Sequence, residues 1–274
     1  MATLSVRKIA RECLDLTGNF SINTHVYGYV HRQTDNSLFG VLGVGDTLPG
    51  SGQPRLRSLR RHLQTISGEA ADLAIVLVGH VPDFSGRVTR DQVTKIQYAI
   101  QIARDIYAQQ NVGIRKIIWG FLTPAQAGGF VDIADRSEAI DLTDDWNGPN
   151  GGIDVFWVQS IGDAGGWSPI GGPCGKDSKF DMTGSVLSLV FGRHDSGILL
   201  AHEVGHVLGL VHGTDVNNVM GTDPDGDGVG QTGPTSTGLT AAQGATMRAH
   251  CQVFTKPLPY YGASAEFAIA LELI

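Results

Sequence analysis

Hydrophobic and polar positions change their period several times along the chain. Two apolar runs, at residues 73–78 and 114–122, flank a segment at 89–111 in which apolar residues recur at helical spacing. Thr89 opens this segment with a capping-box pattern, and Gly113 is placed to end it. The pattern predicts two parallel strands joined by a right-handed crossover helix that packs on a sheet.

Later segments continue the same mixture of strands and helices. Residues 153–161 have strand character and are bounded by glycines, and residues 185–191 have strand character again. The Gly- and Pro-rich stretch between them, at 162–184, predicts a long ordered surface loop near a functional site. Residues 196–211 carry the strongest helical pattern of the second half. These elements predict an α/β (α+β) fold built on a mixed sheet.

The chain divides into three predicted parts. Residues 1–70 have no clear pattern and are described as an N-terminal extension of unclear role, whereas residues 71–252 form the main domain. Residues 253–274 contain two prolines and a short apolar end, which predicts a tail that packs on the body. With 274 residues, 42% of them hydrophobic and 17% charged, the composition is that of a globular protein.

Charge and hydropathy exclude two classes of partner. A net charge of -7 argues against a general nucleic-acid binder, because binding to phosphates requires a basic surface. No stretch reaches the roughly 20 apolar residues that span a bilayer. The first residues also lack the apolar region of a secretory signal. We expect a secreted or otherwise exported protein that has lost its leader or follows another route, and the alternative is a protein that stays inside the cell.

The three cysteines do not form a thiolate metal site. Cys13, Cys174 and Cys251 lie far apart and show no paired C-x-x-C spacing. If the protein is exported, one disulfide is compatible with the sequence, but three pairings are open and one thiol remains in each.

One motif carries specific chemistry. Residues 202–212 read H-E-x-x-H-x-x-G-x-x-H, with histidines at positions 202, 206 and 212. On a helix, His202 and His206 lie one above the other, so both imidazoles can bind one ion. Gly209 can take a positive φ, which lets the chain leave the helix sharply and bring His212 to the same ion.

This residue set predicts a single catalytic zinc ion. Three protein ligands leave one coordination position open, which distinguishes a catalytic zinc from a closed structural one. Glu203 adjoins the first ligand and can act as the general base that takes a proton from the zinc-activated water. A purely structural zinc site would not need a base at this position.

The extended motif and the methionine that follows it resemble the metzincin clan of metallopeptidases. In that clan a methionine packs beneath the metal without binding it, and Met220 would have this role. The spacing from His212 to Met220, with Asp215 between them, is most similar to the matrixin branch. The resemblance covers about residues 70–252 and implies a zincin-like twisted sheet with a long crossover helix, an active-site helix and a C-terminal helix that starts at 239–243.

Some positions depart from the matrixin pattern, and the resemblance has further implications. Gly213 replaces the usual serine and Gly221 replaces the Tyr-Pro that shapes the specificity pocket. The histidines of a second, structural zinc and a cysteine switch around Cys13 are missing from the sequence.

The resemblance also implies how substrate binds: an extended peptide adds to the edge strand of the sheet. We expect residues 153–161 to form this edge strand.

An acidic stretch directly after Met220 is compatible with a calcium site. Asp223, Asp225 and Asp227 alternate with other residues as in a calcium loop, but Pro234 stands where an EF-hand requires its bidentate glutamate. A full EF-hand is excluded, and an acidic solvent loop is the alternative to a calcium ion bound with help from elsewhere.

The sequence therefore predicts a zinc-dependent endopeptidase that acts on protein or peptide substrates. The alternatives are a zinc- or calcium-stabilised binding protein without proteolysis, and a protease toxin or effector directed at one host protein. The intact Glu203 argues against the first alternative. Substrate preference, latency and oligomeric state have no signal in the sequence.

Overall fold

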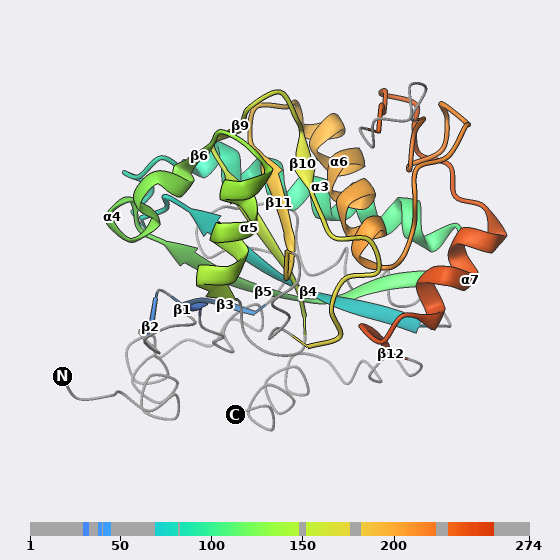
Figure 1. Ribbon diagram of the computed structural model, residues 1–274, viewed down its shortest axis with the longest axis horizontal. Coiled ribbons are helices and arrows are strands. Elements are labelled where there is room, and N and C mark those ends of the chain that lie inside the picture. The colour runs from blue at the N-terminus through green and yellow to red at the C-terminus, as the bar shows by residue number, and fades with distance from the viewer. Residues whose placement is uncertain are drawn as a thin grey trace, which may run out of the picture.

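A mixed sheet forms the centre of the molecule (Figure 1). The computed structural model describes residues 69–147 apart from 82, residues 152–175, 182–222 and 230–254, and three short strands nearer the N-terminus. The strands of the central sheet follow one another in the order β10 (Gly166–Trp167), β11 (Ser185–Ser188), β8 (Ile153–Val158), β4 (Glu69–Val78), β5 (Val112–Leu122) and β3 (Val41–Val44), and β12 (Val253–Phe254) pairs with the start of β4.

The core of the sheet is parallel and its margins are antiparallel. Strands β11, β8, β4 and β5 run in one direction, whereas β10, β3 and β12 are antiparallel to their neighbours. Every residue of β4 after Glu69 is buried. A strand that is apolar without alternation is typical of a sheet covered on both faces. The predicted α/β class with a mixed sheet is confirmed.

Helix α3 (Arg90–Ala108) connects the parallel strands β4 and β5, so the predicted crossover is confirmed. Thr89 caps its first turn, and the side-chain oxygen of Gln92 accepts a hydrogen bond from the N–H of Thr89. The prediction that Gly113 ends this helix is wrong, because Gly113 lies inside β5. The chain instead reverses through Asn111, whose φ of 55° is a left-handed value that asparagine tolerates.

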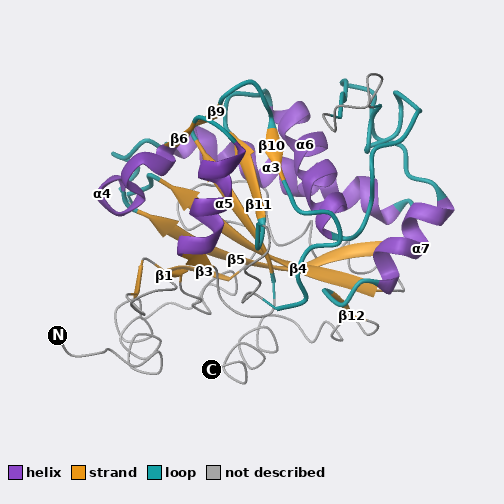
Figure 2. Ribbon diagram, in the orientation of Figure 1, coloured by secondary structure: helices purple, strands orange, loops and turns teal. Residues whose placement is uncertain are grey.

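Helices cover both faces of the sheet (Figure 2). Helices α3 and α6 (Arg193–Val207) pack in one core together with Leu73 and Ile75 of β4. Val76 and Val78 point to the other face and pack with α5 (Arg136–Asp145). The short helices α4 (Pro124–Ala127) and η1 (Gly128–Val131) lie at the same end as α5.

The edge strand differs from the prediction. Residues 153–161 were expected to form the edge, but β8 lies inside the sheet between β11 and β4. The edge beside the motif helix is β10, within the stretch at 162–184 that is predicted to be loop. A strand of two residues has no readable period, because alternation needs at least four positions. Its pairing with β11 therefore had no local signal.

The remaining elements are short, apart from α7 (Ala241–Ala249), whose start confirms the predicted C-terminal helix. Thr240 caps it with a capping box. Two small sheets accompany the central one. The first contains β2 (Leu38–Phe39), β1 (Val30–Arg32) and β7 (Trp146–Asn147), and the second pairs β6 (Asp132–Ile133) with β9 (Ser160–Ile161).

No helix in the described ranges is long and apolar enough to cross a membrane. The tail predicted at 253–274 enters the sheet through β12, and its last twenty residues lie outside the described ranges.

Candidate metal centre

Helix α6 and the turn after it bring the three motif histidines together. The helix extends over Arg193–Val207, and not over 196–211 as the periodicity predicts. Gly209 ends it with a φ of 92°, and its N–H donates to the carbonyl of His206 at 2.8 Å. A side chain would strain this left-handed backbone, so glycine fits the sharp exit that brings His212 back to the helix.

The Nε2 atoms of the three imidazoles converge on one point. His206 Nε2 lies 3.0 Å from His202 Nε2 and 3.0 Å from His212 Nε2, and the third separation is 3.3 Å. Zinc–nitrogen bonds of about 2.0–2.1 Å at tetrahedral angles place ligand nitrogens about 3.3–3.4 Å apart. The spacing and the donor set therefore fit one zinc ion held by three imidazoles.

Backbone carbonyls orient the two helical histidines. Nδ1 of His202 lies 2.9 Å from the carbonyl oxygen of Val219, and Nδ1 of His206 lies 2.8 Å from that of Leu210. A carbonyl accepts from a protonated Nδ1, so each Nε2 keeps its lone pair for the metal. Burial lowers the pKa of both imidazoles to about 4, and hence both are neutral ligands at pH 7.

Glu203 lies beside the ligands under the edge strand. A Cβ at Gly166 of β10 would come within 2.8 Å of its carboxylate, so this glycine allows the strand to pass directly over it. The Ser168 hydroxyl donates a hydrogen bond to the Glu203 carboxylate, and Ser168 Oγ lies 2.8 Å from Ser185 Oγ. Glu203 Oε2 is buried and has no hydrogen-bond partner within the described part of the chain. This oxygen can therefore accept a further hydrogen bond.

Burial raises the pKa of the Glu203 carboxyl, and the nearby His206 and Ser168 partly offset that increase. Tyr107 of α3 is fully buried close by, and its hydroxyl donates to the carbonyl of Ala201 at 2.8 Å. This bond fixes the motif helix to the crossover helix at the residue directly before His202.

Met220 lies buried against the motif helix. A Cβ on Gly205 would meet Met220 Sδ at 3.0 Å, so the thioether packs against the helix between the two helical histidines. The N–H of Met220 donates to Asn218 Oδ1 at 3.0 Å. Asn218 also exchanges two side-chain hydrogen bonds with Gln243 of α7, at 2.8 and 2.9 Å. The C-terminal helix thereby fixes the turn that contains Met220.

Asp215 has a structural place in the turn that leads to Met220. Its side chain is exposed and accepts from the N–H of Asn217 at 2.9 Å, while its carbonyl accepts from the N–H of Asn218.

Asp223, Asp225 and Asp227 lie outside the described residues, so the calcium site stays a prediction.

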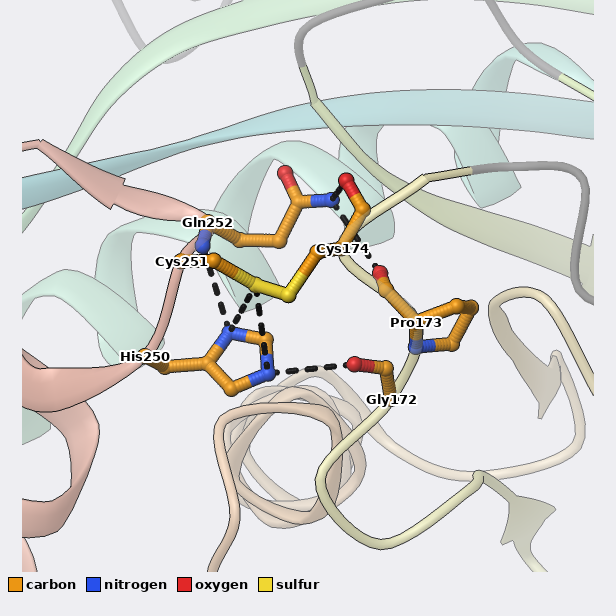
Figure 3. The surroundings of a disulfide bond; sticks show 6 residues. All are labelled: Gly172, Pro173, Cys174, His250, Cys251 and Gln252. Carbon is orange, nitrogen blue, oxygen red and sulfur yellow. Dashed lines mark hydrogen bonds between the residues drawn. A yellow bond between two sulfur atoms is a disulfide. The ribbon is translucent and has the colours of Figure 1, made fainter.

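A disulfide fixes the loop that follows β10 (Figure 3). Cys174 and Cys251 are bonded, which selects one of the three open pairings, and Cys13 lies outside the described residues. His250 Nε2 lies 3.1 Å from the carbonyl of Gly172, and Gln252 donates to the carbonyls of Pro173 and Cys174.

The same loop reaches the last turn of the motif helix. The N–H groups of Gly171 and Gly172 donate to the carbonyls of His206 and Val207, both at 2.9 Å. Helix C-terminal carbonyls lack partners within the helix, so the bond from Gly172 satisfies the Val207 carbonyl, and the bond from Gly171 is a second one to the His206 carbonyl, which also accepts from Gly209. The loop predicted near a functional site thus contacts the helix at a ligand residue.

Sequence reasoning missed Gly166, Ser168 and Tyr107. Their places near Glu203 depend on strand pairing and helix packing, and no local pattern marks them. The signal available for Gly166 is a glycine one position before a tryptophan in a short glycine-rich stretch, which does not identify a strand.

Comparison with known proteins gives one family match. Residues 137–253, from α5 to β12, match the model of the metallo-peptidase family M12B, described as reprolysin-like. This part of the chain resembles a metallopeptidase. The match supports the metallopeptidase prediction, and the matrixin branch stays a prediction. None of the curated proteins compared with the chain matches it.

Three solved structures show distant similarity. Metalloproteinase-II from Bacteroides fragilis is 14% identical with a TM-score of 0.40, over 66% of this chain and 53% of that chain. Archaemetzincin from Methanopyrus kandleri is 15% identical with a TM-score of 0.41, over 66% of this chain and 95% of that one. A chain from a chaperone–substrate complex is 14% identical with a TM-score of 0.36, over 67% of this chain and 34% of that chain. The matched region spans about half the length of the Bacteroides protein.

Proposed function

We propose that the chain is a zinc-dependent endopeptidase in which His202, His206 and His212 hold one catalytic zinc. The observation that carries the proposal is the convergence of three imidazole nitrogens, 3.0–3.3 Å apart, beside a buried glutamate. A purely structural site has no need of this carboxylate, whose Oε2 is free of partners within the described ranges. The family match over residues 137–253 supports the same chemistry.

The residues of the site divide the reaction between them. His202, His206 and His212 would hold the zinc ion, which would supply a lowered pKa for water and polarisation of the scissile carbonyl. Glu203 would take the proton from the attacking water and later deliver it to the leaving amine. The raised pKa of the Glu203 carboxyl favours both steps, because a base that is easily reprotonated also acts well as an acid.

The substrate peptide extends along β10. One side of this strand pairs with β11, and among the described residues β10 has no strand on its other side; it passes over Glu203. An extended peptide can add its main chain to such an edge, and the scissile bond then lies between the strand and the motif helix. Main-chain pairing supplies affinity without selecting a sequence, which fits an endopeptidase.

An oxidising compartment is part of the proposal. The bond between Cys174 and Cys251 supports it, because disulfides persist in exported proteins and are rare in reducing compartments.

The test compares the protein with Glu203→Gln and, as matched control, Glu138→Gln in α5. Each is incubated with a diverse peptide mixture, with and without a chelator, and the products are sequenced. We expect chelator-sensitive, zinc-restored cleavage by the parent and the control, and at least about a hundredfold lower kcat for Glu203→Gln with zinc still bound. Equal cleavage by Glu203→Gln, or a parent that binds no zinc, would overturn the proposal.

A further inference from the structure

The backbone at Gly230 lies against two of the three metal-ligating rings. A Cβ built on this residue would overlap His212 Nε2, lie 2.5 Å from His212 Cδ2 and lie 3.0 Å from His202 Cε1. Van der Waals contact between carbon atoms requires about 3.5–4.0 Å. A methyl group at position 230 would therefore fall between the two rings and press on the ligand atom of His212 itself.

Hydrogen bonds hold Gly230 in this place. The neighbouring residue Gln231 pairs with Thr222: the N–H of Gln231 donates to the Thr222 carbonyl at 2.7 Å, and the N–H of Thr222 donates back at 3.1 Å. Gly221, which directly follows Met220, has a φ of 58°, and a Cβ on it would overlap the carbonyl of Gln231. The segment at 230–231 is thus packed onto the residues that follow Met220.

A second set of contacts limits how far this segment can move outward. The N–H of Gly233 donates to Ser236 Oγ at 2.8 Å, and the Ser236 hydroxyl donates to the carbonyl of Val216 at 2.5 Å. His194 Nε2 lies 2.9 Å from the carbonyl of Pro234. Because the chain directly after Gly230 is tied at Gln231, Gly233 and Pro234, a side chain at position 230 presses on the His212 ring.

We propose that Gly230 is a positioning residue of the metal centre, whose missing side chain leaves His212 Nε2 accessible to the ion. This inference rests on the proposed zinc site. The residue touches no substrate and acts through His212. It explains how a chain that covers the ligands on this side still leaves the third imidazole in ligand geometry.

The test measures zinc affinity of the full chain by competition with a chromophoric chelator. The variant is Gly230→Ala, and the matched control is Gly233→Ala, where a Cβ would meet nothing within 4 Å. Changes next to metal ligands typically weaken affinity about 10–100-fold, so we expect at least a tenfold loss for Gly230→Ala and none for Gly233→Ala. Cobalt substitution adds a signature: the visible spectrum of Gly230→Ala should approach that of His212→Ala. Equal zinc affinity and an unchanged cobalt spectrum in Gly230→Ala would refute the inference.

A double-mutant cycle separates this role from a general requirement of the fold. In a His212→Ala background only the approach to His202 Cε1 at 3.0 Å remains, so Gly230→Ala should change zinc affinity and thermal stability much less than in the parent. If Gly230→Ala alone does not fold, folding of the double variant supports the inference and failure of both overturns it. A parent protein that binds no zinc would instead refute the proposed function, so the two failures are distinguishable.

Discussion

Replacing Cys174 and Cys251 by serine removes the disulfide that joins the loop after β10 to the segment directly after α7. The two cysteines are 77 residues apart, and the loop between them contains β11, α6 and α7. In the chain-entropy description, closing a loop of this size restricts the unfolded chain by about 15 cal/mol/K, which corresponds to about 4.5 kcal/mol at 25 °C. Residual structure in the unfolded chain lowers this gain, so we expect a loss of about 3–4 kcal/mol.

The assay is equilibrium unfolding in urea, followed by tryptophan fluorescence and circular dichroism on chelator-treated protein. Metal must be removed because zinc binds only the folded state and adds its own stabilisation. With a slope near 3 kcal/mol per molar urea for a chain of this size, the midpoint should fall by about 1 M. All proteins carry Cys13→Ser, so no free thiol can exchange with the bond.

Two further results are expected if the effect lies in the unfolded chain. Reductant should shift the parent to the midpoint of the serine variant and leave the variant unchanged. Zinc affinity under native conditions should be the same in both, because Gly171 and Gly172 still bond to the helix and His250 and Gln252 still hold the loop. The reasoning is refuted if the serine variant and the oxidised parent unfold at the same urea concentration.

Three other substitutions test the elements that position the ligands. Gly209→Ala places a side chain at a φ of 92°, so we expect about 1–2 kcal/mol lower stability in urea and weaker zinc binding by chelator competition. Gly197→Ala should lower stability by up to about 2 kcal/mol, because its Cβ would lie 2.5 Å from Ile102 Cβ and overpacking outweighs the gain of about 1 kcal/mol in helix propensity. Tyr107→Phe removes the bond to Ala201 and should cost about 1 kcal/mol or slightly more, measured in the same unfolding assay.

Controls for these variants come from exposed glycines. Gly128→Ala strains a left-handed backbone in open space and should leave zinc affinity unchanged, in contrast to Gly209→Ala. Gly129→Ala has nothing within 4 Å and should be nearly neutral. A more stable Gly197→Ala would show that α3 and α6 can separate freely, contrary to the packing described. A Tyr107→Phe protein as stable as the parent would mean that its hydroxyl contributes nothing to the contact between these helices.

Local patterns account for the parts of the fold that were predicted correctly. The crossover helix had a capping box and a long apolar stripe, and β4 was a continuous apolar run, so both could be read within a few residues. The ends of these elements were predicted less accurately. Gly113 resembled a helix stop, but Asn111 made the turn, because asparagine can also adopt the left-handed conformation.

The candidate site was readable only where its residues follow one another. His202, Glu203 and His206 share one helix, and Gly209 brings in His212, so a single stretch of sequence encodes their convergence. The edge strand β10 depends on its pairing with β11, 20 residues away, and two residues cannot show a strand period. The disulfide partner likewise depends on the fold, since spacing alone left three pairings open.

The residues that complete the centre from a distance are mostly glycines, and this explains why the sequence does not reveal them. Gly166 lets the edge strand pass over Glu203, Gly205 receives Met220 and Gly230 approaches His212. In each case the structural information is the absence of a side chain, which becomes meaningful only when the facing residue is known. Among 37 glycines, local patterns identify the turn at Gly209, whereas these three can be recognised only from contacts made across the fold.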